Sequence, residues 1–392
     1  MSPPVRGASA TCVALLALGC GGRTSGRGGA SVDASDDAVD ARVPAEAAAD
    51  GEAPPSCAPG GPGMTNCSPG GSGTESCCTS LEVTGGTYYR AYDADDAGRL
   101  LAPDSGFPAL APDGGPTAEA DPATVSSFRL DKYLVTVGRF RQFVSAWSGG
   151  AGWLPPAGSG KHVHLNGGAG LVSAGQPGTY EPGWVASDDA SVAPTSSNLA
   201  CALDYFYGTP SGTWTVSPGA NESLPINCVN WFEAYAFCIW DGGFLPSEAE
   251  WEYAAAGGSQ QRAYPWGSKD PGTGNAFAIY GCYYPSGSPD ASSLTFTCSS
   301  VANIAPVGTA IRGAGLWGQL DLAGDVWVWN LDLFAAYLAC TDCADFTATD
   351  GRLLHGGSFR GPKDFLVPVA IQDIAGSDYR GSDLGFRCAR TP

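Results

Sequence analysis

The chain has 392 residues and 43% hydrophobic content, which allows one large domain or two ordinary ones with a sizeable core. Its formal net charge is −19, from 39 acidic against 20 basic residues. This charge excludes the basic surface that a nucleic-acid-binding protein needs and disfavours charge-driven adhesion to an anionic membrane. With 56 glycines and 30 prolines, the composition predicts long irregular loops, a disordered segment, or both.

The N-terminus predicts export. A single arginine precedes the apolar run Cys12–Leu18, which is too short to span a bilayer and is typical of a signal peptide over residues 1–19. Small residues before Cys20 resemble a bacterial lipoprotein cleavage box, although Ala17 stands where such boxes usually carry Leu. We expect cleavage before Cys20 and its lipidation. The alternative is an ordinary secreted protein in which Cys20 is incidental. No later segment of the sequence is long and apolar enough for a transmembrane helix.

Two segments without an apolar pattern follow. Residues 20–56 are mostly Gly, Ala, Asp and Ser without an aromatic, so they cannot offset their ordering entropy, and we expect a flexible acidic tether. Residues 57–80 form a small Cys-rich collar, whose four cysteines allow three pairings that the sequence does not choose between: Cys57, Cys67, Cys77 and Cys78. The 14 cysteines of the chain lack the repeated spacing of zinc sites, so we expect disulfides in an oxidising compartment, periplasmic or extracellular.

The first part of the domain alternates short elements with loops. Strand-forming residues surround a Gly-Gly turn in residues 81–90, and Asp, Pro and Gly fill a loop over 91–122. A strand is predicted over 128–135. It leads into a helix whose N-cap is Thr136 and whose apolar side chains have helical spacing: Phe140, Phe143, Val144 and Trp147. Residues 148–224 are poorly periodic and rich in Gly and Ser.

Two helices with complete capping signals lie in the middle of the domain. Asn230 is the predicted N-cap of the first, with Glu233 three residues later, and Ser247 with Glu250 repeats the motif for the second. A pair of glycines ends each helix. Short strand-like segments recur in three places: 319–332, 352–359 and 384–390. These few short helices, short strands and long loops predict one α+β domain over residues 81–392.

The second of these helices is crowded with glutamates and aromatics: Glu248, Glu250, Trp251, Glu252 and Tyr253. Three carboxylates on a helix are candidates for a general base or for metal ligands. Glu250, however, is used by the cap, and Glu248 and Glu252 lie four residues apart on one face, where carboxylates are usually solvated. Trp251 belongs to an inward stripe with the alanines that follow it. We therefore expect this helix to be scaffold rather than an active site.

Several segments, in chain order, resemble the formylglycine-generating enzyme, or sulfatase-modifying factor, family. They are FRLDKYLVTVGRFRQFV, LPINCVNWFEAYAFCIWDGGFLPSEAEWEYAAAGG, AYPWG, LAGDVWVWNLD, HGGSF and GFRCA. The resemblance implies a C-type-lectin-like fold, which is a compact α+β domain with little regular structure. It also implies a structural role for the glutamate-rich helix.

The resemblance implies a copper site that this sequence does not carry. The family uses two cysteines shortly after a Gly-Gly-Ser motif to bind copper(I) and oxidise a substrate cysteine to formylglycine, a task for soft thiolates. Here the motif is at residues 356–358, the first copper position is Gly361 and the second is Leu366. Neither side chain can ligate copper, so copper is not expected and no catalytic residue is assigned. Cys340 and Cys343 precede the motif and cannot simply substitute.

Calcium sites are also implied by the resemblance, and they are partly eroded. One uses a Glu that is replaced here by Val328, with Asp325 as a neighbouring carboxylate that could compensate. Calcium is therefore the one cofactor that we retain as a candidate. At this first site the carbonyls of Ala323, Gly324 and Val326 would be ligands, and a second site could begin at Asn275 and Ala276.

Four disulfides are expected in the domain. The family positions that correspond to Cys238 and Cys388 are bridged, which would tie the central helix to the last strand. The further expected pairs are Cys201–Cys228, Cys282–Cys298 and Cys340–Cys343.

Other chemistry finds little support. His162 and His164 lie two residues apart, but no third metal ligand is identifiable, so we expect a polar surface strand. The leading function is non-catalytic: an exported bacterial protein, attached to a membrane only through its lipid, that binds an unknown protein or glycan or acts as a scaffold. One rival is a copper-dependent oxidase that converts protein cysteine to formylglycine. The other is an enzyme with different catalytic groups, whose sign would be a polar cluster facing Ser358.

Overall fold

The computed structural model describes residues 53–67, 74–92, 120–201, 212–288, 298, 300–347, 351–368 and 376–392. All of the elements below belong to residues 48–392. Cys20, the predicted signal peptide and nearly all of the predicted tether lie outside the described residues. Within the described ranges, no helix has the length and apolar character needed to cross a membrane.

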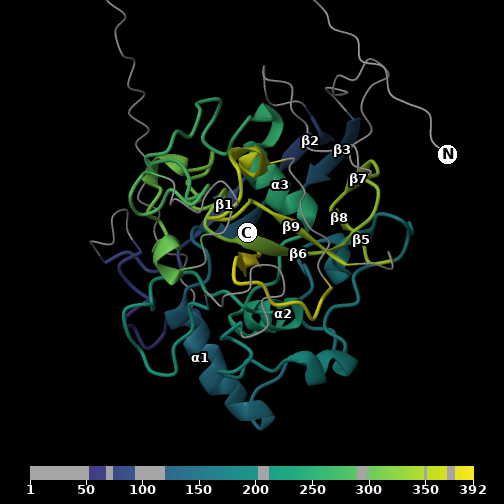
Figure 1. Ribbon diagram of the computed structural model, residues 1–392. Helices are drawn as coiled ribbons and strands as arrows, with labels where there is room; N and C mark the ends of the chain where they lie inside the picture. Colours follow the sequence, from purple (N-terminus) through teal and green to yellow (C-terminus); the bar gives the residue numbers. More distant parts are fainter. Residues whose placement is uncertain are drawn as a thin grey trace, which may run out of the picture. The chain divides into compact units, whose positions relative to one another are not determined.

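The strands of the described residues form small sheets with the orders β1-β4-β11, β10-β6-β9, β2-β3-β7 and β5-β8 (Figure 1). The pairs β6–β10, β3–β7 and β5–β8 are parallel, and the other pairs are antiparallel. The strand bounds are β1 Ser80–Val83, β2 Gly86–Ala91, β3 Ala120–Val125, β4 Phe128–Asp131, β5 Val172–Ser173, β6 Trp327–Leu333, β7 Cys340–Thr341, β8 Cys343–Ala344, β9 Arg352–His355, β10 Leu384–Gly385 and β11 Ala389–Arg390.

The helices are as short as the composition predicted. The α-helices are α1 Val137–Trp147, α2 Trp231–Trp240 and α3 Glu248–Ala256. Short 3-10 helices lie in the loops: η3 Ser148–Gly150, η4 Asn166–Gly168, η5 Ala186–Ser191, η6 Gly258–Gln260, η8 Val301–Asn303, η9 Ile311–Gly313 and η10 Lys363–Leu366. This mixture of short helices, short strands and long loops is the α+β architecture that the sequence predicted.

The starts of the three α-helices follow the predicted capping signals. The Thr136 hydroxyl accepts a hydrogen bond from the backbone N–H of Arg139 at 3.2 Å. Gly257 ends α3 with a φ of 68°, a conformation that glycine adopts at little cost. Complete capping boxes begin the other two helices: Asn230 with Glu233 and Ser247 with Glu250. These predictions are confirmed. The sequence could make them because each cap depends only on side chains within one helical turn.

Strand β6 contacts both α2 and α3, and Figure 1 shows it between them. Its side chains alternate in direction, so Trp329 packs in the apolar cluster that contains α2, while Val328 packs in the cluster around α3. On the α2 side the rings of Phe140, Phe237 and Phe386 meet, with the Phe237 centroid 5.7 Å from the first and 5.3 Å from the last. Ring packing of this kind supplies much of the core.

Disulfides join all of the described cysteines: Cys57–Cys78, Cys67–Cys77, Cys201–Cys228, Cys238–Cys388, Cys282–Cys298 and Cys340–Cys343. The last four are the expected pairs, of which Cys238–Cys388 was implied by the resemblance. The first two select one of the three pairings that the collar allows. Since every cysteine after Cys20 is oxidised, the protein fits an oxidising compartment.

The collar contacts α1 through a buried network of charged side chains around Arg139. Arg139 is fully buried, and its Nη1 donates to the Cys77 carbonyl at 3.1 Å and to Asp131 Oδ2 at 3.0 Å. Its Nη2 donates to Asp241 Oδ2 at 2.6 Å, and the other oxygen of Asp241 accepts the backbone N–H of Ser56 at 3.0 Å. Removing one member of such a buried network leaves an uncompensated charge, so the collar and the domain stabilise each other.

The expectation that Glu248 and Glu252 are solvated is wrong, because both are fully buried. Glu248 forms an ion pair with Arg90 of β2 and accepts a hydrogen bond from the Tyr337 hydroxyl at 2.6 Å. The Tyr88 hydroxyl, also from β2, donates to Glu252 at 3.2 Å. Strands β2 and β3 cover this face of α3. Helical spacing identifies a polar face but not the element that packs on it.

Trp251 is buried as predicted, and its ring stacks on His355 with the centroids 4.8 Å apart. The expectation of a polar surface strand at His162 and His164 is wrong. This segment is a turn, His162 is fully buried, and the ring of His164 stacks on Phe244 at 5.8 Å. Burial of His162 is tolerated because two carboxylates from other segments contact its ring.

Candidate functional site

The two positions that the resemblance assigns to copper are packed with apolar side chains. Leu366 is 1% exposed and lies in a cluster with Tyr280 and Ala323. A Cβ at Gly361 would lie 2.9 Å from the Phe365 ring, so that ring occupies the space into which a side chain would project. Because all of the described cysteines are in disulfides as well, these residues do not fit a copper(I) thiolate site, and no catalytic step is derived through copper.

Ser358 lies in a buried polar cluster. Its Oγ donates to Asp383 Oδ2 at 3.2 Å, and close by Arg360 Nη2 donates to Ser382 Oγ at 2.6 Å. These side chains are all buried. A polar cluster at Ser358 was the expected sign of substitute catalytic groups. Its members bond to one another inside the protein, and Ser358 does not line the pocket described below.

The turn before β6 retains part of the donor set that calcium prefers. Oδ1 of Asp325 accepts a backbone N–H at 3.0 Å, while its Oδ2 is buried with no hydrogen-bond partner among the described residues. Burial, reinforced by the neighbouring Asp321, raises the pKa of Asp325 well above its usual value. The predicted carbonyl ligands lie in the same turn or at its end: Ala323, Gly324 and Val326.

The second predicted calcium position is less available. Asn275 Oδ1 is buried without a partner among the described residues, but the Ala276 carbonyl already accepts the backbone N–H of Arg312 at 2.9 Å. Across the ranges that the structure describes, no three His, Cys, Asp or Glu side chains converge in a way that could hold a metal ion. Of the two predicted positions, the one at Asp325 is therefore the better candidate.

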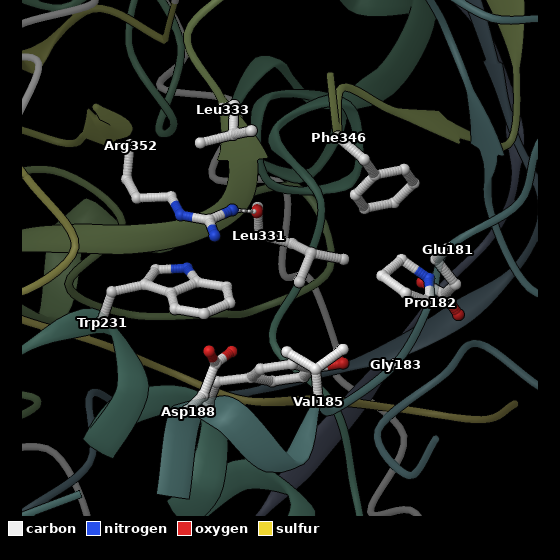
Figure 2. A pocket seen from close by; sticks show the side chains of 11 residues that line it. Glu181, Pro182, Gly183, Val185, Asp188, Trp231, Leu331, Leu333, Phe346 and Arg352 are labelled. Atoms are coloured by element: carbon white, nitrogen blue, oxygen red, sulfur yellow. Dashed lines mark hydrogen bonds between the residues drawn. The ribbon is translucent and has the colours of Figure 1, made fainter. Parts of the chain in front are cut away.

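A pocket of about 120 Å³ lies between α2, β6, β9 and the segment 181–188 (Figure 2). A cavity of this size suits a single residue-sized group, because pockets for drug-sized ligands measure about 300–1,000 Å³. Its lining combines segments that are far apart in the sequence. The walls are mostly apolar: Pro182, Gly183, Val185, Trp231, Tyr235, Leu331, Leu333 and Phe346.

Two opposite charges also face this pocket. The Arg352 guanidinium lies 3.6 Å from the centroid of the Trp231 ring, and its Nη1 donates to the Leu331 carbonyl at 2.6 Å. Figure 2 shows Asp188 on the other side of that indole. Among the described hydrogen bonds, its carboxylate accepts only one, from the Ser187 hydroxyl at 3.4 Å. Arg352 and Asp188 lie close enough for their charges to attract each other, although no ion pair between described residues joins them. Burial raises the pKa of Asp188 in spite of Ser187 and Arg352, and it lowers the pKa of Arg352 to about 10 in spite of Asp332 and Asp188, so burial outweighs the opposite charges at both groups.

One wall of the pocket contains Glu181, which belongs to a buried row of three charged side chains with His162 and Glu250. Glu181 lines the pocket, and its Oε2 lies 2.9 Å from Nδ1 of His162. Nε2 of His162 lies 3.0 Å from Oε2 of Glu250, the capping-box residue of α3. Burial alone would lower the pKa of His162, but the carboxylates of Glu250 and Glu181 outweigh it and raise that pKa to about 10. His162 is therefore an imidazolium that holds Glu181 in place.

None of these pocket residues was predicted as functional. Asp188 lies in the stretch that was poorly periodic, and Arg352 begins a strand-like segment in which only the Gly-Gly-Ser motif at residues 356–358 drew attention. The one available signal was the pair Trp231 and Tyr235, four residues apart on α2 and hence on one helical face. That spacing equally describes core residues, so it does not identify a pocket.

Comparison with known proteins places the chain in a family. Residues 70–392 match the Sulfatase-modifying factor enzyme 1-like domain. The mouse formylglycine-generating enzyme is 27% identical over 284 residues, which are 69% of this chain and 68% of the mouse protein. The formylglycine-generating enzyme of Thermomonospora curvata is 28% identical over 289 residues, covering 68% of this chain and 83% of that one. The mouse protein named Inactive C-alpha-formylglycine-generating enzyme 2 is 27% identical over 297 residues, with coverages of 71% and 80%.

Two solved structures are also similar. PvdO from Pseudomonas aeruginosa has a TM-score of 0.47 and 17% identity, covering 81% of this chain and 100% of that one. Treponema denticola variable protein 1 has a TM-score of 0.44 and 17% identity, with coverages of 80% and 95%. The family match spans most of the chain and includes every segment on which the resemblance was based. The chain therefore belongs to the sulfatase-modifying factor enzyme 1-like family, with its C-type-lectin-like α+β fold.

Proposed function

We propose that this domain is a non-catalytic binding domain of the sulfatase-modifying factor family. The observation that carries the proposal is the replacement of both copper positions by Gly361 and Leu366, together with the pairing of all the described cysteines in disulfides. Copper(I) requires soft ligands such as thiolates. The cysteines outside these disulfides are Cys12, in the predicted signal peptide, and Cys20, the first residue of the tether, and both precede the domain. The rival oxidase would have to draw its ligands from them.

The family itself supports a binding role. One of its mouse members is named as inactive, so a member of the family need not be an active enzyme. In this chain the apolar packing around Leu366 stands in place of a thiolate site, while the pocket beside α2 offers aromatic walls and two charges. A ligand-binding surface of this kind suits a protein or glycan partner at the cell envelope.

Anchoring at the envelope is part of the proposal. The apolar run before Cys20 and the small residues that adjoin it support removal of residues 1–19 and lipidation of Cys20. The acidic tether of residues 20–56 would then hold the domain away from the membrane surface.

Calcium near Asp325 is a second part of the proposal, supported by the buried carboxylate oxygen without a partner. Thermal melts in calcium and in a chelator test it. Calcium should raise the Tm of the wild type, because a ligand that binds only the folded state stabilises it. In the Asp325→Asn variant this rise should disappear, and an equal rise in both proteins would place the ion elsewhere.

A copper assay tests the main proposal. The purified chain is incubated with copper, a thiol reductant and a sulfatase-type cysteine peptide, and the mass of the peptide is followed. The Thermomonospora curvata relative serves as the positive control. We expect no formylglycine from this chain under conditions in which the control converts the peptide. Copper-dependent conversion by this chain would show that other groups have taken over the chemistry.

A further inference from the structure

We propose that the pocket between α2, β6 and β9 binds a hydrophobic α-amino acid in its zwitterionic form. The carboxylate of the ligand would contact Arg352, its ammonium group would contact Asp188, and its side chain would fill the apolar part of the cavity. This inference rests on the proposed function, because it assigns a ligand class to a binding domain.

Arg352 is arranged as a carboxylate receptor. Its Nε donates to Ser377 Oγ at 3.1 Å and its Nη1 donates to the Leu331 carbonyl at 2.6 Å, while its plane lies over the Trp231 ring. None of the hydrogen bonds between described residues uses its Nη2. A guanidinium that is already oriented loses little freedom when it binds an anion, and the N–H edge of Arg matches a carboxylate geometrically.

Asp188 supplies the opposite charge. It stands on η5, which forms a different wall of the pocket from the strand β9 that carries Arg352. The two charges line one cavity from opposite sides of the Trp231 indole, and no ion pair between described residues joins them, although each acts on the pKa of the other. A ligand with an adjacent cation and anion would satisfy both groups through charge-assisted hydrogen bonds, whereas a singly charged ligand would satisfy only one of them.

The remaining surface selects the side chain of the ligand. Leu331, Leu333, Val185 and Phe346 present hydrocarbon to the cavity, so burial of an aliphatic group there is favoured by the hydrophobic effect. Glu181 does not compete for the ammonium group as a free carboxylate, because His162 already holds it. The volume of about 120 Å³ suits a ligand with a single amino-acid side chain.

A series of ligands tests the inference on the wild-type protein. Calorimetric titrations of the purified full chain are carried out with L-leucine, glycine, leucinamide and N-acetyl-leucine. We expect leucine to bind, and each of the other three to bind about tenfold more weakly or worse, because each lacks one of the three recognised groups. Equal binding of glycine, leucinamide or N-acetyl-leucine would overturn the inference, and so would the absence of leucine binding to the folded chain.

Paired variants locate the site. Asp188→Asn and Arg352→Gln should each weaken leucine binding about tenfold or more. The matched controls are Asp270→Asn, which changes an exposed carboxylate, and Arg312→Gln, which changes an exposed guanidinium; neither lines the pocket. Both controls should bind as the wild type does. A thermal melt confirms that each variant is folded, and if Arg352→Gln is not, Asp188→Asn and the ligand series still decide the outcome.

One further ligand separates a free amino acid from a residue of a peptide. N-acetyl-leucine-amide has no charge but keeps the side chain and two peptide groups. Weaker binding than leucine supports the zwitterion, and binding as tight as leucine would overturn it in favour of a peptide segment. Failure of this inference appears in these titrations, whereas failure of the proposed function appears as copper-dependent conversion of the cysteine peptide, so the two are distinguishable.

Discussion

Nε2 of His162 lies 3.0 Å from Oε2 of Glu250, although the two residues belong to a loop and to the first turn of α3. The same carboxylate oxygen accepts the backbone N–H of Ser247 at 2.8 Å and so completes the capping box. Glu250 therefore connects the start of α3 to the ring of His162. The other nitrogen of that ring contacts Glu181, which lines the pocket. A residue that the sequence identified as a helix cap is also the inner anchor of the pocket wall.

Replacing His162 should destabilise the protein strongly. In His162→Gln the carboxylates of Glu181 and Glu250 would remain buried without their cation, and removing one member of a buried ion pair costs about 3–5 kcal/mol. The free energy of unfolding from denaturant melts measures this cost. The control is His164→Gln, whose ring nitrogens have no hydrogen-bond partner among the described residues and whose loss should cost about 1 kcal/mol or less. Equal costs would contradict the proposed row of charges.

The same contacts predict how stability depends on pH. The folded protein raises the pKa of His162 from 6.5 to about 10, so the folded state binds the proton more tightly than the unfolded chain does. The stabilisation is fully present below about pH 6.5 and is lost as the pH rises through about 10. The free energy of unfolding of the wild type should therefore fall between these limits relative to that of His162→Gln. Parallel pH profiles for the two proteins would refute this assignment.

Two glutamates on one face of α3 should respond in opposite ways to the same substitution. Burial would raise the pKa of Glu248, but Arg90 and His355 outweigh it and hold that pKa well below the usual range. Glu248→Gln leaves Arg90 buried without its partner and should cost about 3–5 kcal/mol. Burial, followed by the charge of Glu248, raises the pKa of Glu252 well above its usual value, which favours the neutral carboxyl.

Glu252→Gln accordingly replaces one neutral group by another of the same shape and should change the free energy of unfolding by about 1 kcal/mol or less. Denaturant melts of the two single variants at neutral pH provide the comparison, and each serves as the control for the other. If Glu252→Gln proved the more destabilising, the assignment of the charge to Glu248 would be reversed.

The disulfide between Cys238 and Cys388 should contribute much of the stability of the domain. It spans a sequence separation of 150 residues, and closing so long a loop removes about 5 kcal/mol of unfolded-chain entropy in the simple polymer model. The double variant Cys238→Ala/Cys388→Ala should lose stability on this scale. Cys340→Ala/Cys343→Ala, with a separation of 3, is the matched control and should lose about 2 kcal/mol or less. Denaturant melts that rank the two in the opposite order would exclude loop entropy as the main contribution.

Lipidation of Cys20 can be tested directly on the mature protein. Mass spectrometry of the N-terminal peptide should identify Cys20 as the first residue, with the added mass of a lipid. The Cys20→Ala variant should lose both the modification and the partition of the protein into detergent. An unmodified N-terminus at another residue would show that the protein is secreted without an anchor.

Local interactions explain what the sequence determined by itself. Thr136, Asn230 and Ser247 lie within three residues of the groups that they cap, so the helix starts could be predicted from short patterns. The family was equally visible, because its segments occur in order along the chain. The absence of thiols at positions 361 and 366 is also a property of the sequence alone.

Only the tertiary structure decided the environment of the charged side chains. Glu248 meets Arg90 across 158 positions of sequence, and His162 meets Glu250 across 88. Asp188 and Arg352 share a pocket because η5, α2, β6 and β9 converge there. Whether a carboxylate is solvated, paired or poised for a ligand depends on which distant segment covers it. Periodicity and capping patterns carry no information about such contacts, since they extend only over a few turns of one element.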